Sequence, residues 1–282
     1  MSLSSIAEFA SVAEFARKTS SLPGGVVGVV LCESDLHATA SAKWLARLGT
    51  GAVIAIGPGV DAESVACPVI QIAERPYERG IAEQLNLLFG ALDGRWVAWL
   101  WAGEFLIYPF YETRSLADLT AFMTDERRRS LYTYALDLYA QDLPGAETCP
   151  TEAALSIDIS GYHAFPKENQ QLRVFGGLGW RFQEMVPRGM EQIGRTSLFK
   201  AARSVRMDRE LIFHDPDYAA VQCPWHNNPT GAVMTLRRTR RIMAHPNFGP
   251  LRERLEWRGT EPFDWTSSQL LERGMIEPGQ WF

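Results

Sequence analysis

The sequence has few cysteines, no long apolar run and no excess of positive charge. Its four cysteines lie far apart and form no CxxC pair, which argues against a zinc cluster and indicates reduced, cytoplasmic thiols (Cys32, Cys67, Cys149 and Cys223). No run approaches the ~18 to 20 apolar residues of a membrane span, so we expect at most peripheral membrane contact. The formal charge of -5 argues against a general nucleic-acid binder, which is normally basic.

Two common catalytic signatures are also missing. No G-x-S-x-G turn is present, which argues against a Ser/His/Asp hydrolase. The glycine clusters Gly24-Gly25 and Gly49-Thr50-Gly51 precede strands, whereas a dinucleotide-binding fingerprint needs its glycines after the strand, where they open a helix. We therefore expect turn and packing glycines, and no Rossmann dehydrogenase.

What is present is a regular alternation of short apolar runs and helical patterns. Four short, mainly apolar runs predict neighbouring strands of a mostly parallel sheet (Val26–Leu31, Ala52–Ile56, Val69–Ile72 and Trp96–Leu100). The segments "ATASAKWLARLG", which ends at Gly49, and "YERGIAEQLNLLFGAL" have helical spacing. Because strands and helices alternate, the first hundred residues predict an α/β fold.

The rest of the chain is organised differently. Residues 1–22 predict a helical extension, and residues 23–282 predict one domain with a divergent C-terminal half. In that half, Ser115 and Asp118 form a capping-box pattern at the start of a helix. The basic run from Arg237 to Arg241 is typical of one face of a solvated segment, with a membrane-surface or phosphate contact as the alternative.

A run of tryptophans followed by an acid occurs in "RWVAWLWAGEFLIYP", where Glu104 comes directly after the fourth strand. This segment resembles the strand ending in D-x-D-E-F-L of a bacterial branch of the family-2 glycosyltransferases. Three later segments are similar to further motifs of that family, in the same order ("RVFGGLGWRF", "IGRTSLFKA" and "WHNNPTGAVM"). The resemblance extends from about Val26 to Met243.

The resemblance implies a GT-A-like fold, the sandwich of nucleotide-diphospho-sugar transferases. It places a nucleotide half at about 23–110 and an acceptor half at about 111–282. It also implies a nucleotide-sugar donor, a glycan or other acceptor, and a divalent cation (Mn or Mg) held by the D-x-D carboxylates, because hard cations prefer oxygen ligands. Trp101 and Gly103 occupy the two aspartate positions here, so the cation's ligands are absent.

Further departures occur at the strand ends. Cys32 replaces the amide of an Asn-Glu pair, and Pro58 lies where the second strand should end in a carboxylate and an amide. The acids and bases that remain give a candidate site, with Glu104 as the base that deprotonates an acceptor. The donor-binding candidates are Glu33, Arg181, Arg195 and His226, and Trp101 is a candidate acceptor platform.

Two functions therefore remain open. The chain is expected to transfer a sugar from a nucleotide donor, without metal, or to be a degenerate homologue that binds a glycan or a partner. Each candidate residue also has a structural alternative: Glu104 can accept backbone N–H groups, Glu33 can accept a hydrogen bond at a strand end, and Trp101 can fill the cleft.

Overall fold

The computed structural model describes most of the chain and divides it into two compact units. The described residues are 7–18, 21–76, 80–140, 154–166, 172–187, 192–218, 228–248 and 255–281. The first unit comprises Met1–Phe105, Thr113–Leu131 and Thr196–Ala219, and the second comprises Leu106–Glu112, Tyr132–Arg195 and Ala220–Phe282. Each unit is thus formed by three separate segments of the chain.

The first unit is built on a large, mostly parallel sheet. Its strand order is β1 (Ala7–Phe9), β4 (Val69–Ile72), β3 (Ala52–Ile56), β2 (Val27–Leu31), β5 (Trp96–Trp101) and β11 (Gly194–Lys200). The first five strands are parallel to their neighbours, and β11 is antiparallel to β5. The four strands expected from apolar runs are confirmed, and their order places β2 at the centre.

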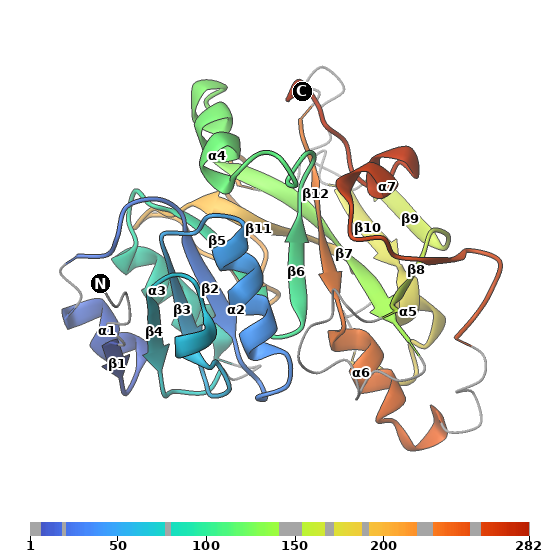
Figure 1. The fold of residues 1–282 in the computed structure, drawn as a ribbon, viewed down its shortest axis with the longest axis horizontal. Helices are drawn as coiled ribbons and strands as arrows, with labels where there is room; N and C mark the ends of the chain where they lie inside the picture. The colour runs from blue at the N-terminus through green and yellow to red at the C-terminus, as the bar shows by residue number, and fades with distance from the viewer. Residues whose placement is uncertain are drawn as a thin grey trace. The chain divides into compact units, whose positions relative to one another are not determined.

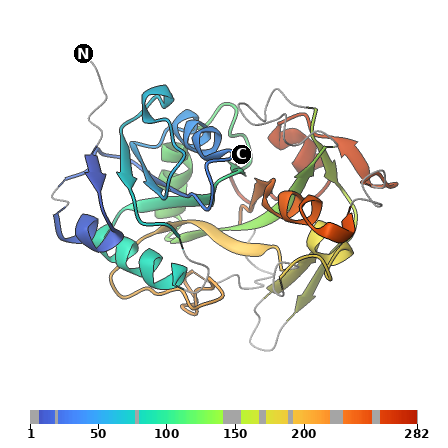
Figure 2. The ribbon, with the colours of Figure 1, turned by 90° about the horizontal axis from the view of Figure 1, so that it is seen from below.

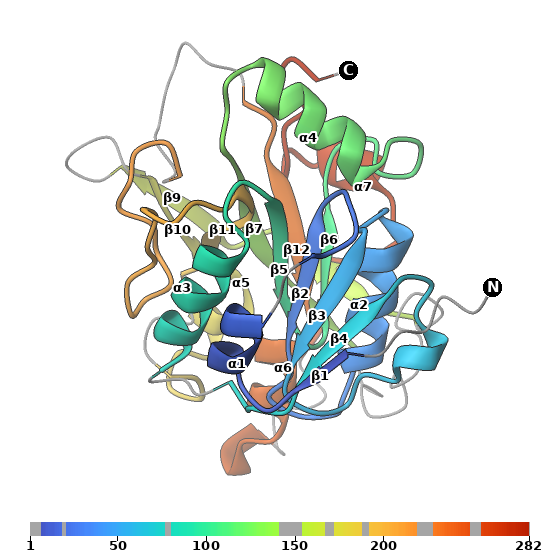
Figure 3. The ribbon, with the colours of Figure 1, turned by 90° about the vertical axis from the view of Figure 1, so that its left-hand side faces the viewer.

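Helices cover both faces of this sheet, which explains why its strands are apolar on both sides. Helices α1 (Val12–Lys18) and α3 (Ile81–Ala91) pack together on one face, and α2 (Ala38–Arg47) lies on the other (Figures 1 and 3). Gly49, with a φ of 91°, follows α2 as expected, and its N–H bonds the carbonyl of Ala46. The α/β class is confirmed.

The N-terminal extension differs in part from its expected form. Helix α1 is present, but the preceding residues form strand β1, which pairs in parallel with β4 through Ala7 and Ile70. Phe9 then meets Phe15 of α1 edge to face, with ring centroids 5.4 Å apart. The extension therefore continues the sheet and covers one of its faces.

The link from β5 into the second unit is made by β6 (Glu104–Ile107), and α4 (Leu116–Asp125) follows in the first unit. The expected capping box at Ser115 is present: its Oγ accepts the Asp118 N–H at 3.2 Å, and Asp118 accepts the Ser115 N–H at 2.8 Å. This reciprocal pair satisfies two N–H groups that have no partner inside the helix.

The second unit has a mixed sheet and a separate hairpin. Strand β12 (Gly231–Thr235) lies between β7 (Ser130–Tyr139) and β6, and β8 (Ser156–Asp158) joins β7 to β13 (Thr260–Pro262). Strands β9 (Tyr162–Pro166) and β10 (Leu172–Gly176) form the hairpin, which leads into α5 (Gly177–Arg181) (Figure 2). Two further helices are α6 (Arg237–Met243) and α7 (Ser267–Glu272).

A buried ion pair organises the second unit. Asp137 of β7 is fully buried, and its Oδ1 accepts a hydrogen bond from Nε of Arg238 at 2.6 Å. Its Oδ2 accepts the N–H of Leu178 at 2.8 Å, where α5 begins. Burial raises the pKa of Asp137, and the Arg238 guanidinium opposes that shift. The pair therefore ties β7 to both α5 and α6.

This arrangement corrects, for one residue, the expectation that the basic run is a solvated face; the other three arginines of the run are partly exposed. Arg238 is only 5% exposed, because it turns inward to reach Asp137. Gly177 fits the same contact: its φ is +64°, and a Cβ there would lie 2.3 Å from Oδ2 of Asp137. The glycine allows the carboxylate to approach the start of α5.

We predict that Asp137→Asn lowers the free energy of unfolding by about 3–5 kcal/mol, because it removes the buried carboxylate charge that the buried Arg238 guanidinium contacts. The matched control is Glu261→Gln, which breaks the exposed pair with Arg273 and should cost less than about 1 kcal/mol. Urea unfolding of the full chain measures both. Equal costs would contradict the organising role of the buried pair.

Candidate functional site at the carboxyl edge of the first sheet

The strand order of the first unit has its topological switch point between β2 and β5. The chain leaves β2 toward β3 on one side and returns to β5 on the other, and ligands of open α/β sheets bind at such a switch point. Leu31 of β2 pairs in parallel with Trp101 of β5, so Glu33 and Glu104 follow the strands at the same edge. Their expected shared edge is confirmed.

Glu104 is engaged in the turn that joins β5 to β6. Its Oε2 accepts the N–H of Trp101 at 2.8 Å, and the side chain is almost fully buried. Ser41 of α2 completes the turn, because its Oγ accepts the N–H groups of Gly103 at 2.9 Å and Glu104 at 3.2 Å. Gly103 has a φ of 84°, a conformation that other L-residues rarely adopt.

The same turn lies over the end of β2. The N–H of Ala102 donates to the carbonyl of Leu31 at 2.9 Å. Trp101 is 4% exposed and belongs to the hydrophobic core of the unit together with Trp99. Most of its ring is therefore turned to the core, which leaves little of it for a sugar to stack on.

The loops after β2 and β3 also pack closely together. A Cβ at Gly57 would lie 2.4 Å from the carbonyl oxygen of Cys32, and a Cβ at Gly59 would lie 2.4 Å from Cα of Asp35. Burial raises the pKa of Cys32 to about 12, so the thiol stays protonated near neutral pH. The loops after β2 and β3 are therefore in backbone contact at Cys32, where the family resemblance implies the amide of an Asn-Glu pair.

The described residues at this edge do not form a metal-binding group. The D-x-D positions hold an indole and a glycine, and no group of three or more His, Cys, Asp or Glu side chains within the described ranges could hold a metal ion. Glu33 is half-buried at the edge, and one carboxylate does not supply the several oxygen ligands that Mn or Mg requires. The described residues therefore do not fit the cation that the family resemblance implies.

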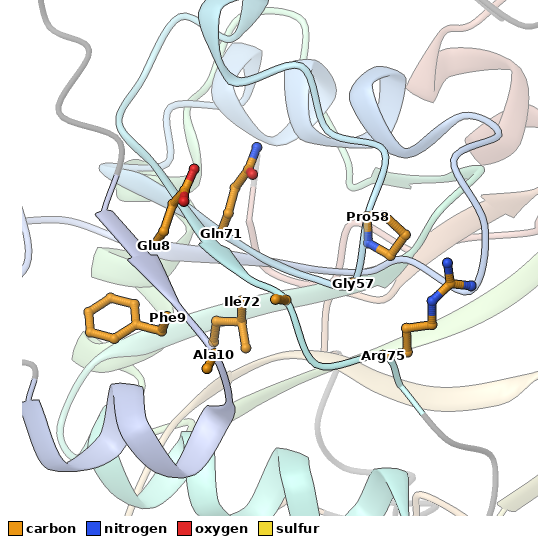
Figure 4. A pocket seen from close by; sticks show the side chains of 9 residues that line it. Glu8, Phe9, Ala10, Gly57, Pro58, Gln71, Ile72 and Arg75 are labelled. Atoms are coloured by element: carbon orange, nitrogen blue, oxygen red, sulfur yellow. The ribbon is translucent and has the colours of Figure 1, made fainter.

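An open cavity lies farther along the same edge, at the ends of β1, β3 and β4. It has a volume of about 510 Å³ and is lined by Glu8, Phe9, Ala10, Gly57, Pro58, Gln71, Ile72, Ala73 and Arg75. Glu8 and Gln71 are partners in the β1–β4 register, and their side chains point to the same side (Figure 4). Arg75 and Pro58 lie at the other end of the cavity from Glu8 (Figure 4).

The polar groups of this cavity are available to a ligand. Glu8 and Arg75 are exposed, and neither side chain makes a hydrogen bond or ion pair within the part of the chain that the structure describes. Gln71 is oriented by a bond from its Nε2 to the carbonyl of Val60 at 2.8 Å. The sequence did not predict the β1 side of this cavity, because a three-residue strand gives too short a pattern to predict β1.

The cationic candidates belong to the second unit. Arg181 donates from Nε to the buried Asp158 at 3.0 Å and from Nη2 to Ser160 at 3.2 Å. Its guanidinium also lies over the Trp257 ring, 4.5 Å from the centroid. Arg181 is thus neutralised by a carboxylate.

The other two candidates are less defined. Arg195 is half-buried on β11, and its carbonyl accepts the Thr133 hydroxyl at 2.9 Å. His226 lies outside the described residues. The structure therefore places Glu33, Trp101 and Glu104 together in the first unit, and Arg181 and Arg195 in the second.

No protein-family model and no curated protein matches the chain. Among the described helices, none combines the length and the apolar character that crossing a membrane requires.

We predict that Gly57→Ala lowers the free energy of unfolding by more than about 2 kcal/mol, because it combines a φ of +94° with a backbone clash at Cys32. Gly90→Ala in α3 is the control, since its Cβ would meet nothing within 4 Å and alanine favours the helix by up to about 1 kcal/mol. Thermal unfolding distinguishes them. A neutral Gly57→Ala would mean that the two loops are not packed together.

Proposed function

We propose that this chain is a glycosyltransferase-like protein of the family-2, GT-A type that binds a glycan and does not carry out metal-dependent glycosyl transfer. The observation that carries the proposal is the hydrogen bond from the Trp101 N–H to Glu104, in a turn where the carboxylate is almost fully buried. An acid in that position holds a turn, whereas a catalytic base must face its substrate.

The chemistry of transfer makes two demands that these residues meet poorly. A general base must come within hydrogen-bond reach of the acceptor hydroxyl, and Glu104 is committed to the backbone beneath the surface. The leaving diphosphate needs positive charge, yet Arg181 already pairs with Asp158 at 2.9 Å. These contacts favour a binding protein over a transferase.

The cavity at the ends of β1, β3 and β4 is the best candidate for the glycan. Sugar hydroxyls both donate and accept hydrogen bonds. The carboxylate of Glu8 accepts, the guanidinium of Arg75 donates, and the amide of Gln71 does both. Pro58 adds apolar area to the same lining, and 510 Å³ is within the range of ligand pockets, roughly 300–1,000 Å³.

Transfer without metal is the second candidate, and one observation favours it. The order β4, β3, β2, β5 places Glu33 and Glu104 at the switch point where ligands of open sheets bind. In that case Glu104 would act as the base after the turn opens. A nucleotide sugar would be the donor.

We predict that a neutral oligosaccharide from a panel of cellohexaose, maltoheptaose and chitohexaose raises the melting temperature of the chain. Ligand binding to the native state must increase its stability. Arg75→Ala and Glu8→Ala should each weaken binding about tenfold, since each removes a charged hydrogen-bonding group. Arg209→Ala is the control, because Arg209 is exposed and does not line the cavity.

Thermal shifts with nucleotides, together with a turnover screen, decide between glycan binding and glycosyl transfer. UDP, GDP and CMP, with and without Mn²⁺, should produce no thermal shift, and a screen of nucleotide sugars should show no turnover. Turnover that survives a chelator and is lost in Glu104→Gln would replace the binding proposal with metal-independent transfer. Failure of every oligosaccharide to bind would refute the cavity assignment.

A further inference from the structure

The second unit contains a cavity of its own, separate from the proposed glycan site. Its volume is about 320 Å³, and three segments form most of its lining: β7, residues 159–162 and residues 273–277. All of the lining residues belong to the second unit. The size is at the lower end of the range for small-molecule pockets, roughly 300–1,000 Å³.

Part of the wall of this cavity is apolar and aromatic. Leu136, Ile193 and Ile276 are buried and contribute aliphatic surface. Tyr162 packs against Gly176, the residue before α5, since a Cβ at Gly176 would lie 2.7 Å from its Cδ1. With Tyr134 it gives the cavity two aromatic rings, and such rings bind apolar groups and organic cations.

Two charged side chains line the cavity, Arg273 and Glu277, and the structure gives a charged partner only to Arg273 among the described residues. Arg273 forms a two-pronged pair with Glu261, from Nε to Oε2 at 3.0 Å and from Nη2 to Oε1 at 2.9 Å. The carboxylate of Glu277, in contrast, makes no hydrogen bond or ion pair with any residue that the structure describes. The cation of the lining is thus paired with a carboxylate outside it, and the charge of Glu277 is the one that no described residue pairs with.

Glu277 is held in place by its backbone. Its N–H donates to Thr230 Oγ1 at 2.9 Å, and its carbonyl accepts the Thr230 N–H at 2.9 Å. Its charge acts on Tyr134: burial raises the pKa of that phenol, and Glu277 raises it further. The carboxylate thus lies near an aromatic wall of the cavity, as an ammonium group would require.

We propose that this cavity binds a small organic ammonium ion with an aromatic body. The ammonium group pairs with Glu277, and the body packs among Tyr134, Leu136 and Ile276. Charge complementarity selects a cation over an anion, because Arg273 already has a carboxylate partner. This ligand and this site are independent of the glycan proposed for the first unit.

Titration calorimetry of the full chain with tryptamine tests the proposal, with 3-indolepropionate and 3-methylindole as the anionic and neutral probes. Tryptamine should bind most tightly, and the anion should not bind measurably. Glu277→Gln should weaken tryptamine binding about tenfold or more, because it removes a charge-assisted contact and keeps the shape. Glu272→Gln, an exposed change on α7 outside the lining, should bind as the native chain does.

Three results would overturn the proposal: no tryptamine binding at millimolar concentration, equal binding of 3-indolepropionate, or unchanged affinity in Glu277→Gln. Tyr134→Leu provides an independent reading, since it removes an aromatic wall without changing charge and should also weaken binding. Arg75→Ala should leave tryptamine binding unchanged. The outcome at this site is therefore separable from that of the glycan experiment.

Discussion

The hydrogen bond between the Glu104 carboxylate and the Trp101 N–H is the constraint on which the carboxyl edge of the first sheet depends. It fixes the turn in which Gly103 takes a positive φ and Ser41 anchors two N–H groups. That turn brings Ala102 over the end of β2 and holds Trp101 in the core. A buried carboxylate needs such partners, because burial without them is costly.

This constraint accounts for where polar side chains are available to ligands. Between β2 and β5, the edge is filled by the turn and by the contact of the two glycine-containing loops. Farther along, β1 adds Glu8 beside Gln71, and the cavity there carries a carboxylate, an amide and a guanidinium. The carboxyl edge of a parallel sheet is where ligands are expected to bind. In this chain the cavity at that edge lies beside β1 and β4, and not at the switch point between β2 and β5.

Much of the first unit could be predicted from the sequence, because short apolar runs and helical spacing are local signals. The four strands, α2, α3 and the capping box at Ser115 all follow from such patterns. Strand β1 could not be predicted, since three residues give no periodicity. Local sequence also could not show that Arg238 turns inward, because its partner Asp137 lies 101 positions away.

The candidate site was predictable in position but not in its contacts. Parallel pairing follows from the strand pattern and brings Glu33 and Glu104 to one edge. The sequence does not show whether the Glu104 carboxylate faces a ligand or its own turn. That depends on the backbone conformation of the turn, which places the Trp101 N–H within reach of the carboxylate. The cavity at β1 was missed for the same reason as the strand that forms it.

The most direct test of this account is the unfolding free energy of Glu104→Ala and Glu104→Gln, measured by urea denaturation. If the carboxylate holds the turn, alanine should cost about 2–3 kcal/mol, because it removes the acceptor that Glu104 gives to the Trp101 N–H and leaves a small void. Glutamine should keep an acceptor and most of the stability. Catalytic residues commonly lower the folding stability of a protein. If Glu104 were such a residue, its substitution by alanine would leave the free energy of unfolding unchanged or raise it. A Glu104→Ala chain as stable as the native one would contradict the account.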